Sequence, residues 1–130
     1  MNSKLQMKLF KKYPKIFRQR KLSMKETCMC WGISCGNGWY TLIDSLCAAI
    51  NNFEPSSQIE ATGVKEKFGG LRFHIDRKSE WVSGAIQMAE IMSYRICETC
   101  GSTDDVKQTK GYIMSLCKEH RKQCTQSKKL

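Results

Sequence analysis

The sequence has no apolar run near the roughly 20 residues that cross a bilayer, so no transmembrane helix is expected. Its basic N-terminus lacks the continuous apolar stretch of a secretory signal, which favours the cytoplasm. Internal repeats and low-complexity tracts are missing too, which excludes solenoids and biased disordered segments. In the cytoplasm, the eight cysteines are better suited to be thiols or metal ligands than disulfides.

Acidic residues are absent from the first part of the chain, and this makes the charge uneven. The 130 residues carry a net charge of +10, and residues 1–25 hold nine Lys or Arg and no acid. Residues 118–130 are also basic, whereas residues 26–117 hold more acids than bases. Basic ends favour a polyanionic partner, either nucleic acid or a protein that carries it. Solvated lysines that only aid solubility are the alternative.

The N-terminal segment has the spacing of an amphipathic helix. Pro14 predicts that this helix ends near Lys12 and that a second turn follows. Such a helix can lie on a membrane or on a partner, but we expect it to pack on the protein's own core. Its apolar positions are Leu5, Leu9, Phe10, Tyr13, Ile16 and Phe17.

A second helix is predicted after a loop at residues 27–38, which is rich in Cys and Gly. Apolar residues from Trp39 to Ile50 form an almost unbroken helical stripe. Asn51, Asn52 and Pro55 are expected to end this helix.

Residues 58–76 alternate between apolar and polar around Gly69-Gly70, which is typical of a β-hairpin. The face expected to point inward carries Phe68, Leu71, Phe73 and Ile75, and the exposed face carries Lys65, Lys67, Arg72 and His74. A further helix is predicted over residues 79–96, with Ser79 as a candidate cap, although Lys78 or Ser79 could equally start the helix. Its apolar face would consist of Trp81, Val82, Ala85, Ile86, Ala89, Met92 and Ile96.

The strongest chemical signal is a set of four metal ligands near the C-terminus. Cys97, Cys100, Cys117 and His120 form the pattern C-x2-C-x16-C-x2-H. Each pair can bind one ion from a single turn, and Gly101 allows the left-handed backbone that often follows the first pair. Tetrahedral Cys3His is a common closed zinc environment, so we expect one structural zinc ion, with iron as a minor alternative.

The segment around these ligands resembles a treble-clef or zinc-ribbon finger in shape. Residues 112–116 are expected to form a short strand and residues 118–124 a helix that starts with the last two ligands. Cys124 is an alternative to His120 as the fourth ligand. The predicted fold class is α+β, with amphipathic helices packed on a β-hairpin. Its parts are a basic N-terminal helical segment (1–25), an α+β core (26–96), the zinc finger (97–124) and a basic tail (125–130).

The remaining cysteines permit a second metal site. Cys28, Cys30 and Cys35 lie close in sequence and could share an ion, with Cys47 or His74 as the fourth ligand. Their C-x-C-x4-C spacing is not that of a usual finger, so this hypothesis is the weaker one. Cys47 lies within an apolar stripe and is better explained as a core residue.

The sequence contains no set of residues typical of a catalytic site. Gly69-Gly70 lacks the Lys-Ser/Thr that follows in a phosphate-binding loop. His74 is the one remaining acid–base candidate of the two histidines, and a lone strand histidine is more often structural. Nucleases of the HNH type, which also use a treble clef, would need further histidines beside a catalytic metal. We therefore expect no enzymatic activity.

Four runs of the sequence together resemble a family of small phage and prophage proteins. They are CGNGWYTLIDSLC, VKEKFGGLRFHI, AEIMSYRICETCG and LCKEH, within residues 25–121. The family pattern is a Cys-Gly-x-Gly-Trp helix start, a Val-Lys-Glu-Lys-Phe-Gly-x-Leu-Arg-Phe hairpin and a C-terminal finger. The resemblance implies a phage origin, an accessory role and a bacterial host cell, but no agreed activity.

Two functions follow as expectations. The first is inhibition of a host defence complex, in the manner of an anti-CRISPR protein that binds an RNA-guided nuclease or its guide RNA. The second is a nucleic-acid-binding regulatory zinc protein of a phage, with Trp31 or Trp39 as stacking faces, although both tryptophans suit a core. The residues expected to contact phosphates or the partner are Lys11, Lys12, Lys15, Arg18, Arg20, Lys65, Lys67 and Arg72.

Overall fold

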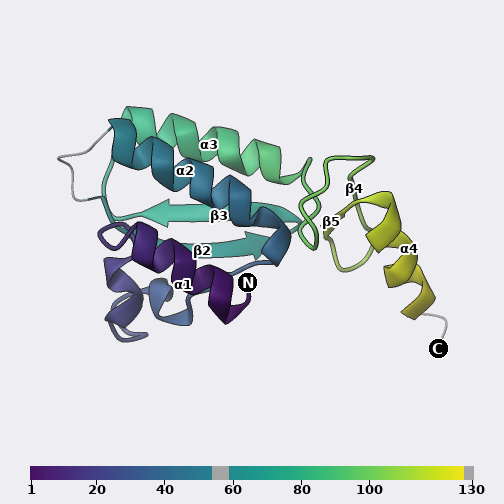
Figure 1. Ribbon diagram of the computed structural model, residues 1–130, viewed down its shortest axis with the longest axis horizontal. Helices are drawn as coiled ribbons and strands as arrows, with labels where there is room; N and C mark the ends of the chain where they lie inside the picture. The colour runs from purple at the N-terminus through teal and green to yellow at the C-terminus, as the bar shows by residue number, and fades with distance from the viewer. Residues whose placement is uncertain (54–58, 128–130) are drawn as a thin grey trace.

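A mixed three-stranded sheet forms the centre of the larger part of the molecule in the computed structural model, which describes residues 1–53 and 59–127 (Figure 1). Its strands are β1 (Ile33–Ser34), β2 (Ala61–Lys67) and β3 (Gly70–Ile75). β1 runs parallel to β2, and β2 pairs with β3 in antiparallel fashion. The helices α2 (Tyr40–Phe53) and α3 (Glu80–Ser93) pack against each other beside this sheet. The predicted α+β class is confirmed.

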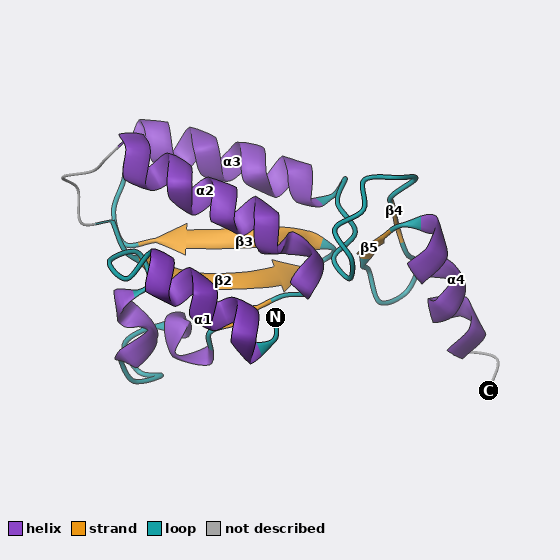
Figure 2. Cartoon of the chain, in the orientation of Figure 1, coloured by secondary structure: helices purple, strands orange, loops and turns teal. Residues whose placement is uncertain are grey.

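Shorter elements lie along one side of this sheet and beyond one of its ends (Figure 2). The N-terminal helix α1 (Ser3–Lys12) ends where Pro14 predicted, and short 3-10 helices follow. These 3-10 helices are Arg18–Lys21, Cys28–Trp31 and Asn37–Trp39. The C-terminal finger has a hairpin of β4 (Lys107–Gln108) and β5 (Ser115–Leu116), followed by α4 (Lys118–Ser127).

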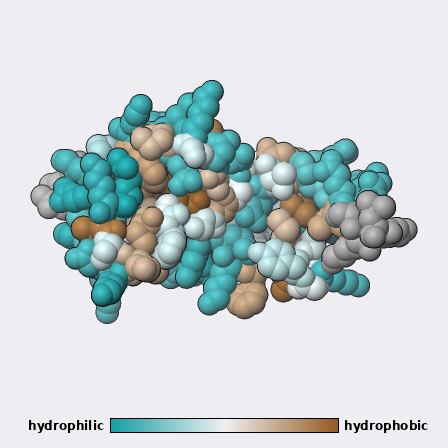
Figure 3. Space-filling view, turned by 90° about the horizontal axis from the view of Figure 1, so that it is seen from below, coloured by the Kyte–Doolittle hydropathy of each residue, from teal (hydrophilic) through white to brown (hydrophobic). Residues whose placement is uncertain are grey.

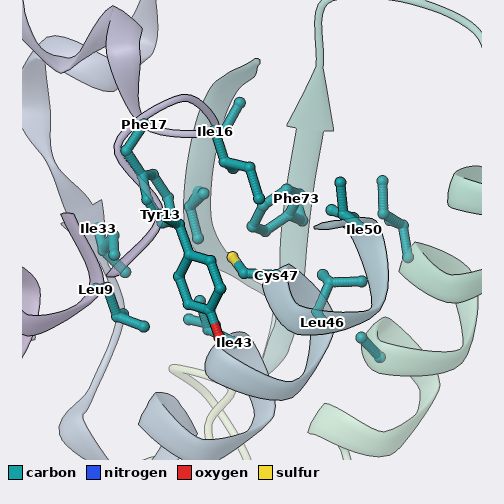
Figure 4. Packing of buried hydrophobic residues seen from close by; sticks show 14 of the residues in the cluster. Leu9, Tyr13, Ile16, Phe17, Ile33, Ile43, Leu46, Cys47, Ile50 and Phe73 are labelled. Carbon is teal, nitrogen blue, oxygen red and sulfur yellow. The ribbon is translucent and has the colours of Figure 1, made fainter. Parts of the chain in front are cut away.

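The core lies between the inner face of the sheet and the helices α1, α2 and α3 (Figure 4). Phe73 of β3 lies close to Cys47 and Ile50 of α2, and Ile33 of β1 lies near Leu9 of α1. The apolar side of the N-terminal segment is buried here, which confirms that it packs on the protein's own core. Its buried members are Leu9, Phe10, Tyr13, Ile16 and Phe17.

Side chains from the helices bind the backbone along both edges of the sheet. Ser93 Oγ accepts a hydrogen bond from the Leu71 N–H at 2.9 Å, and Glu90 Oε1 accepts one from Phe73 at 3.2 Å. On the opposite edge, Gln6 Oε1 accepts from the Ile33 N–H at 3.0 Å. The helices α1 and α3 are therefore each tied to a strand edge by a polar contact in addition to apolar packing.

The hairpin is present, but its turn lies one residue earlier than Gly69-Gly70. Lys67 pairs with Gly70, so Phe68 and Gly69 form the two-residue turn, with φ values of 53° and 82°. The prediction that Phe68 points inward is therefore wrong, and its side chain is 66% exposed. Leu71 and Phe73 are buried as predicted. A turn residue with positive φ leaves the alternation of the strand, so the pattern could not be extended through it.

Several predicted helix boundaries and faces also differ. α2 continues through Asn51 and Asn52 to Phe53, and Pro55 lies outside the described residues. α3 ends at Ser93 instead of residue 96. Trp81 and Met92 are exposed, because the core-facing stripe of α3 is narrower than predicted. It consists of Val82, Ile86, Ala89 and Ser93.

Two further segments, one predicted as a loop and one as a strand, have a different structure from the one predicted. The expected loop at residues 27–38 contains the short strand β1, whose pairing with β2 is non-local. In the finger, the strand predicted over residues 112–116 is limited to Ser115–Leu116. Such short strands depend on their partners more than on their own alternation.

Tyr13 forms a polar contact at the edge of the core that can be tested directly. Its hydroxyl donates to Asp44 Oδ1 at 2.5 Å, and Lys12 Nζ lies 2.9 Å from the same oxygen. The hydrogen bond from Tyr13, followed by the one from Lys12, lowers the pKa of Asp44 although burial opposes this. We expect Tyr13→Phe to destabilise the protein by about 1 kcal/mol at pH 7 in chemical unfolding.

The pH dependence gives this prediction a second readout. Because Asp44 has a lowered pKa in the folded protein, its contribution is present above the ordinary aspartate pKa and is lost as the pH falls. The difference between wild type and Tyr13→Phe should therefore shrink below about pH 4. Tyr112→Phe, at an exposed site, is the control and should change stability little at any pH. A constant difference from pH 7 to pH 3 would contradict this explanation.

Candidate metal centre

The four predicted ligands come together in the finger. The ligand atoms of Cys97, Cys100, Cys117 and His120 all lie within 4.8 Å of one another. His120 Nδ1 is 3.6 Å from Cys97 Sγ and 3.2 Å from Cys117 Sγ, and the sulfurs of Cys100 and Cys117 are 3.9 Å apart.

These separations fit a single tetrahedral ion. Metal–sulfur bonds of about 2.3 Å and metal–nitrogen bonds of about 2.0 Å place two sulfurs about 3.8 Å apart and a sulfur about 3.5 Å from a nitrogen. The observed distances from His120 Nδ1 to the sulfurs lie on either side of the second value. The four residues can therefore hold one metal ion without rearrangement of the backbone.

Local structure explains how each pair is positioned. After Cys100 the chain turns back at Gly101, which has a φ of 81° and donates its N–H to Cys97 O at 2.8 Å. Cys117 directly precedes α4, and its carbonyl accepts the Arg121 N–H at 2.9 Å. His120 thus lies in the first turn of α4, on the side of Cys117. These are the knuckle and helix that the spacing predicted.

The electrostatic surroundings favour a thiolate at Cys97. Burial raises the pKa of this thiol, but backbone hydrogen bonds from Cys117, Cys100 and Thr99 together lower it to about 6. Cys97 itself is fully buried. A buried thiolate that accepts several N–H groups is the state in which a cysteine binds a metal ion.

Glu98, between the two knuckle cysteines, attaches the finger to the core. Its carbonyl accepts the Gly38 N–H at 2.7 Å, and its Oε2 accepts the Gly36 N–H at 2.9 Å. Burial raises the pKa of its carboxyl group. The approach is so close that a Cβ at Gly38 would lie 2.1 Å from Cys97 O. The glycines before α2 are therefore required by contact with the finger, and not only by a turn.

The second metal site is not formed. Within residues 1–53 and 59–127, the four finger residues are the one group of three or more metal-ligating side chains that lie close together. Cys28, Cys30 and Cys35 therefore do not form a group that could share an ion. Cys47 is fully buried among apolar residues, as expected for a core thiol, and burial raises its pKa. Burial likewise raises the pKa of Cys35, to about 12.

Cys124 is not needed as a ligand. It packs, partly buried, against the small cluster of Cys97, Leu116 and Cys117. His120 completes the set instead, as the C-x2-H spacing predicted.

The basic residues predicted from the N-terminal segment are partly engaged within the protein. Lys12 pairs with Asp44, and Arg18 Nη1 lies 3.5 Å from Glu60 Oε2. The Arg20 guanidinium lies over the Phe10 ring at 4.9 Å. Lys11 and Lys15 are exposed. Figure 3, seen from below, shows that this side of the molecule is mostly hydrophilic, with scattered apolar side chains.

The predicted hairpin cations form a second group. Lys65, Lys67 and Arg72 lie on the outer face of the sheet, together with exposed His74. Lys65 is directly opposite Arg72 across the two strands. These cations come from different elements than those of the N-terminal segment, so the structure divides the predicted set in two.

The burial of the aromatic residues differs from the predictions more than that of the other predicted site residues. Trp39 is fully buried and donates its indole N–H to Ile96 O at 2.9 Å, so its suggested role as a stacking face is wrong. Trp31 is 68% exposed, so the expectation that it also lies in the core is wrong. Phe68 and Tyr112 are also exposed, and the sequence did not identify either of them as a candidate binding residue. For Phe68, the available signal was its position immediately before a glycine in a two-residue turn.

No family model matches this chain, and comparisons with curated proteins and with solved structures found no match either. Within the part of the chain that the structure describes, none of the helices is both long and apolar enough to cross a membrane.

Proposed function

We propose that the protein is a phage-encoded accessory protein that acts by binding, with one structural zinc ion in its finger. Three thiols and one imidazole near tetrahedral separations are a ligand set typical of zinc. Because four protein side chains complete a tetrahedral shell, no coordination position is left for water or a substrate. The ion would therefore hold the finger in its folded form.

The observation that carries the proposed binding function is the cationic outer face of the sheet. Lys65 and Arg72 are direct cross-strand neighbours, and exposed Lys67 lies two residues further along the same face. Arg72 is held in place by a 3.3 Å hydrogen bond to the Tyr94 hydroxyl. Like charges opposite each other destabilise a sheet, so this arrangement favours an anionic partner. The phosphates of a nucleic acid supply such an anion in a repeating form.

The target we propose is an RNA-guided nuclease complex of the bacterial host, contacted through its guide RNA. A basic protein cannot imitate nucleic acid, so it would bind the guide itself and disturb guide loading or conformation. This choice draws on the likeness to phage proteins in the hairpin and finger motifs. A regulatory nucleic-acid-binding zinc protein is the second candidate, since the same cationic face suits free RNA or DNA.

Removing one cation from the outer face should weaken RNA binding and reduce its dependence on salt. For Lys65→Gln, the slope of log K against log salt should fall by about 0.7 with a single-stranded RNA, as expected for one lost phosphate contact. Lys78→Gln makes the same change in charge at an exposed site after β3, and it should leave the slope unchanged. Fluorescence anisotropy over a salt series measures both variants. Equal slopes for all three proteins would contradict a role for this face.

A pull-down from host lysate, with and without RNase and DNase, separates the two candidates. An RNA-guided nuclease that is recovered in stoichiometric amount and is inhibited by excess protein supports the inhibitor. Nucleic acid alone, with protein partners lost after digestion, supports the regulatory protein. Full nuclease activity in the presence of excess protein excludes that nuclease as the target.

A further inference from the structure

The turn of the β2–β3 hairpin contains a residue that suits it poorly. Phe68 has a φ of 53° and Gly69 a φ of 82°, so both turn residues are in the left-handed region. Two-residue turns of this kind usually have Asn, Asp or Gly in the first position, since a bulky aromatic residue is strained there. A strained residue that is kept in place by its surroundings points to a function.

Burial does not compensate for this strain. The Phe68 side chain is 66% exposed, and Lys67 Nζ lies 5.7 Å from the centre of its ring. The turn itself is held firmly, because Ser115 Oγ donates to Gly69 O at 2.6 Å and Glu66 Oε1 accepts from the Gly69 N–H at 2.8 Å. The surrounding contacts therefore present the ring at the surface instead of packing it.

A second exposed ring lies at the same place. Tyr112, which is 74% exposed, belongs to the loop between β4 and β5 of the finger. Phe68 and Tyr112 line one cavity of about 340 Å³, together with Glu66, Lys67 and the residues beside Tyr112. Figure 1 shows the end of the β2–β3 hairpin beside the finger, so two distant segments of the chain meet here.

We propose that Phe68 and Tyr112 form a stacking site for a base of single-stranded RNA, with Lys67 next to the adjoining phosphate. This inference rests on the proposed function and names the part of the RNA that is bound. Exposed aromatic rings beside cations are how proteins bind unpaired bases, because every base has a flat π face. The cations Lys65 and Arg72 continue from Lys67 along the outer face, which gives the backbone a path away from the cavity.

Charge distinguishes a base from an apolar side chain of a protein as the occupant. The cavity has a cation at its rim, and the protein as a whole carries a charge of +10. Its carboxylate, Glu66, has one oxygen engaged by Gly69, and a carboxylate is a suitable acceptor for an N–H group at the edge of a base, such as N3–H of uracil. A flat ligand that is anionic on one side and polar at its edge therefore fits this cavity best.

The test uses Phe68→Asn, because asparagine is favoured in this turn position. The variant should unfold at the same temperature as wild type or higher, and it should bind a labelled 12-nucleotide oligouridylate about tenfold more weakly. An abasic strand of equal length keeps the phosphates without the bases, and its affinity should not change. Tyr112→Ser is the second variant and should show the same selective loss. Trp81→Ala removes an exposed ring outside the cavity and is the control.

The two probes separate failure of this inference from failure of the proposed function. Unchanged oligouridylate binding by both variants would overturn the stacking site while leaving phosphate binding intact. An equal loss with both probes would also overturn it, because Phe68 would then act through folding or charge. If wild type binds neither probe, the proposed function fails and the stacking site fails with it.

Discussion

Removal of the metal ion is expected to unfold the finger. The buried residues of the finger cluster are Cys97, Leu116 and Cys117, of which two are ligands, so little apolar packing remains without the ion. Zinc-finger peptides gain about 10–16 kcal/mol of apparent binding free energy from their ion. A chelator should therefore reduce the helical signal in circular dichroism by the contribution of α4, and it should lower the thermal midpoint of unfolding. Metal analysis of the untreated protein should find one ion per chain.

Cys97→Ser should reproduce the effect of the chelator, and Cys117→Ser should do the same. Both variants should lose the bound ion and precipitate more readily, since the finger residues that contact the core become exposed. Cys30→Ser is the matched control, because Cys30 lies outside the ligand set and its side chain donates to Thr27 O, which a serine can also do. Equal stability with and without a chelator would refute a structural role for the metal.

Gly38→Ala is expected to be strongly destabilising, although Gly38 is not a ligand. An added Cβ would lie 2.1 Å from Cys97 O and 2.6 Å from Glu98 O, which are backbone atoms of the metal knuckle. Neither atom can move without displacing the finger from the start of α2. We expect a loss of about 3 kcal/mol, together with weaker metal binding, in chemical unfolding and metal competition.

Gly84→Ala makes the same chemical change where there is space. Gly84 lies in the interior of α3, and no atom outside its helix lies within 4 Å of the added Cβ. Because alanine is the better helix former, this variant should be more stable by about 0.5–1 kcal/mol. If Gly38→Ala is tolerated as well as Gly84→Ala, the close contact between knuckle and core is not essential.

Local signals in the sequence predicted local structure well. The spacing of the four ligands was sufficient for the metal centre, because each pair needs only one turn to bring its members together. The stripe around Ile43, Leu46 and Cys47 was sufficient for α2, and Ser79 was identified correctly as the cap of α3.

Features that depend on contacts between distant segments were not predicted. β1 has two residues, and it forms only because β2 lies beside it. Gly36 and Gly38 were expected only as part of a Gly-rich loop, whereas the close approach of Glu98 from the finger explains why glycine is needed at both positions. Pairing of Lys12 with Asp44 likewise depends on how α1 packs on α2, which no periodicity reveals.

The polar contacts along the edges of the sheet limit how another protein can associate with this one. A strand from a second molecule binds a sheet by pairing with free backbone N–H and C=O groups, and uncontrolled pairing of this kind leads to aggregation. Along β3, the N–H groups of Leu71 and Phe73 are already bound by Ser93 and Glu90. Growth of the sheet from this edge would first have to displace α3. Recognition at this edge must therefore use side chains, and an intact α3 protects the molecule against polymerisation through the longer of its two edge strands.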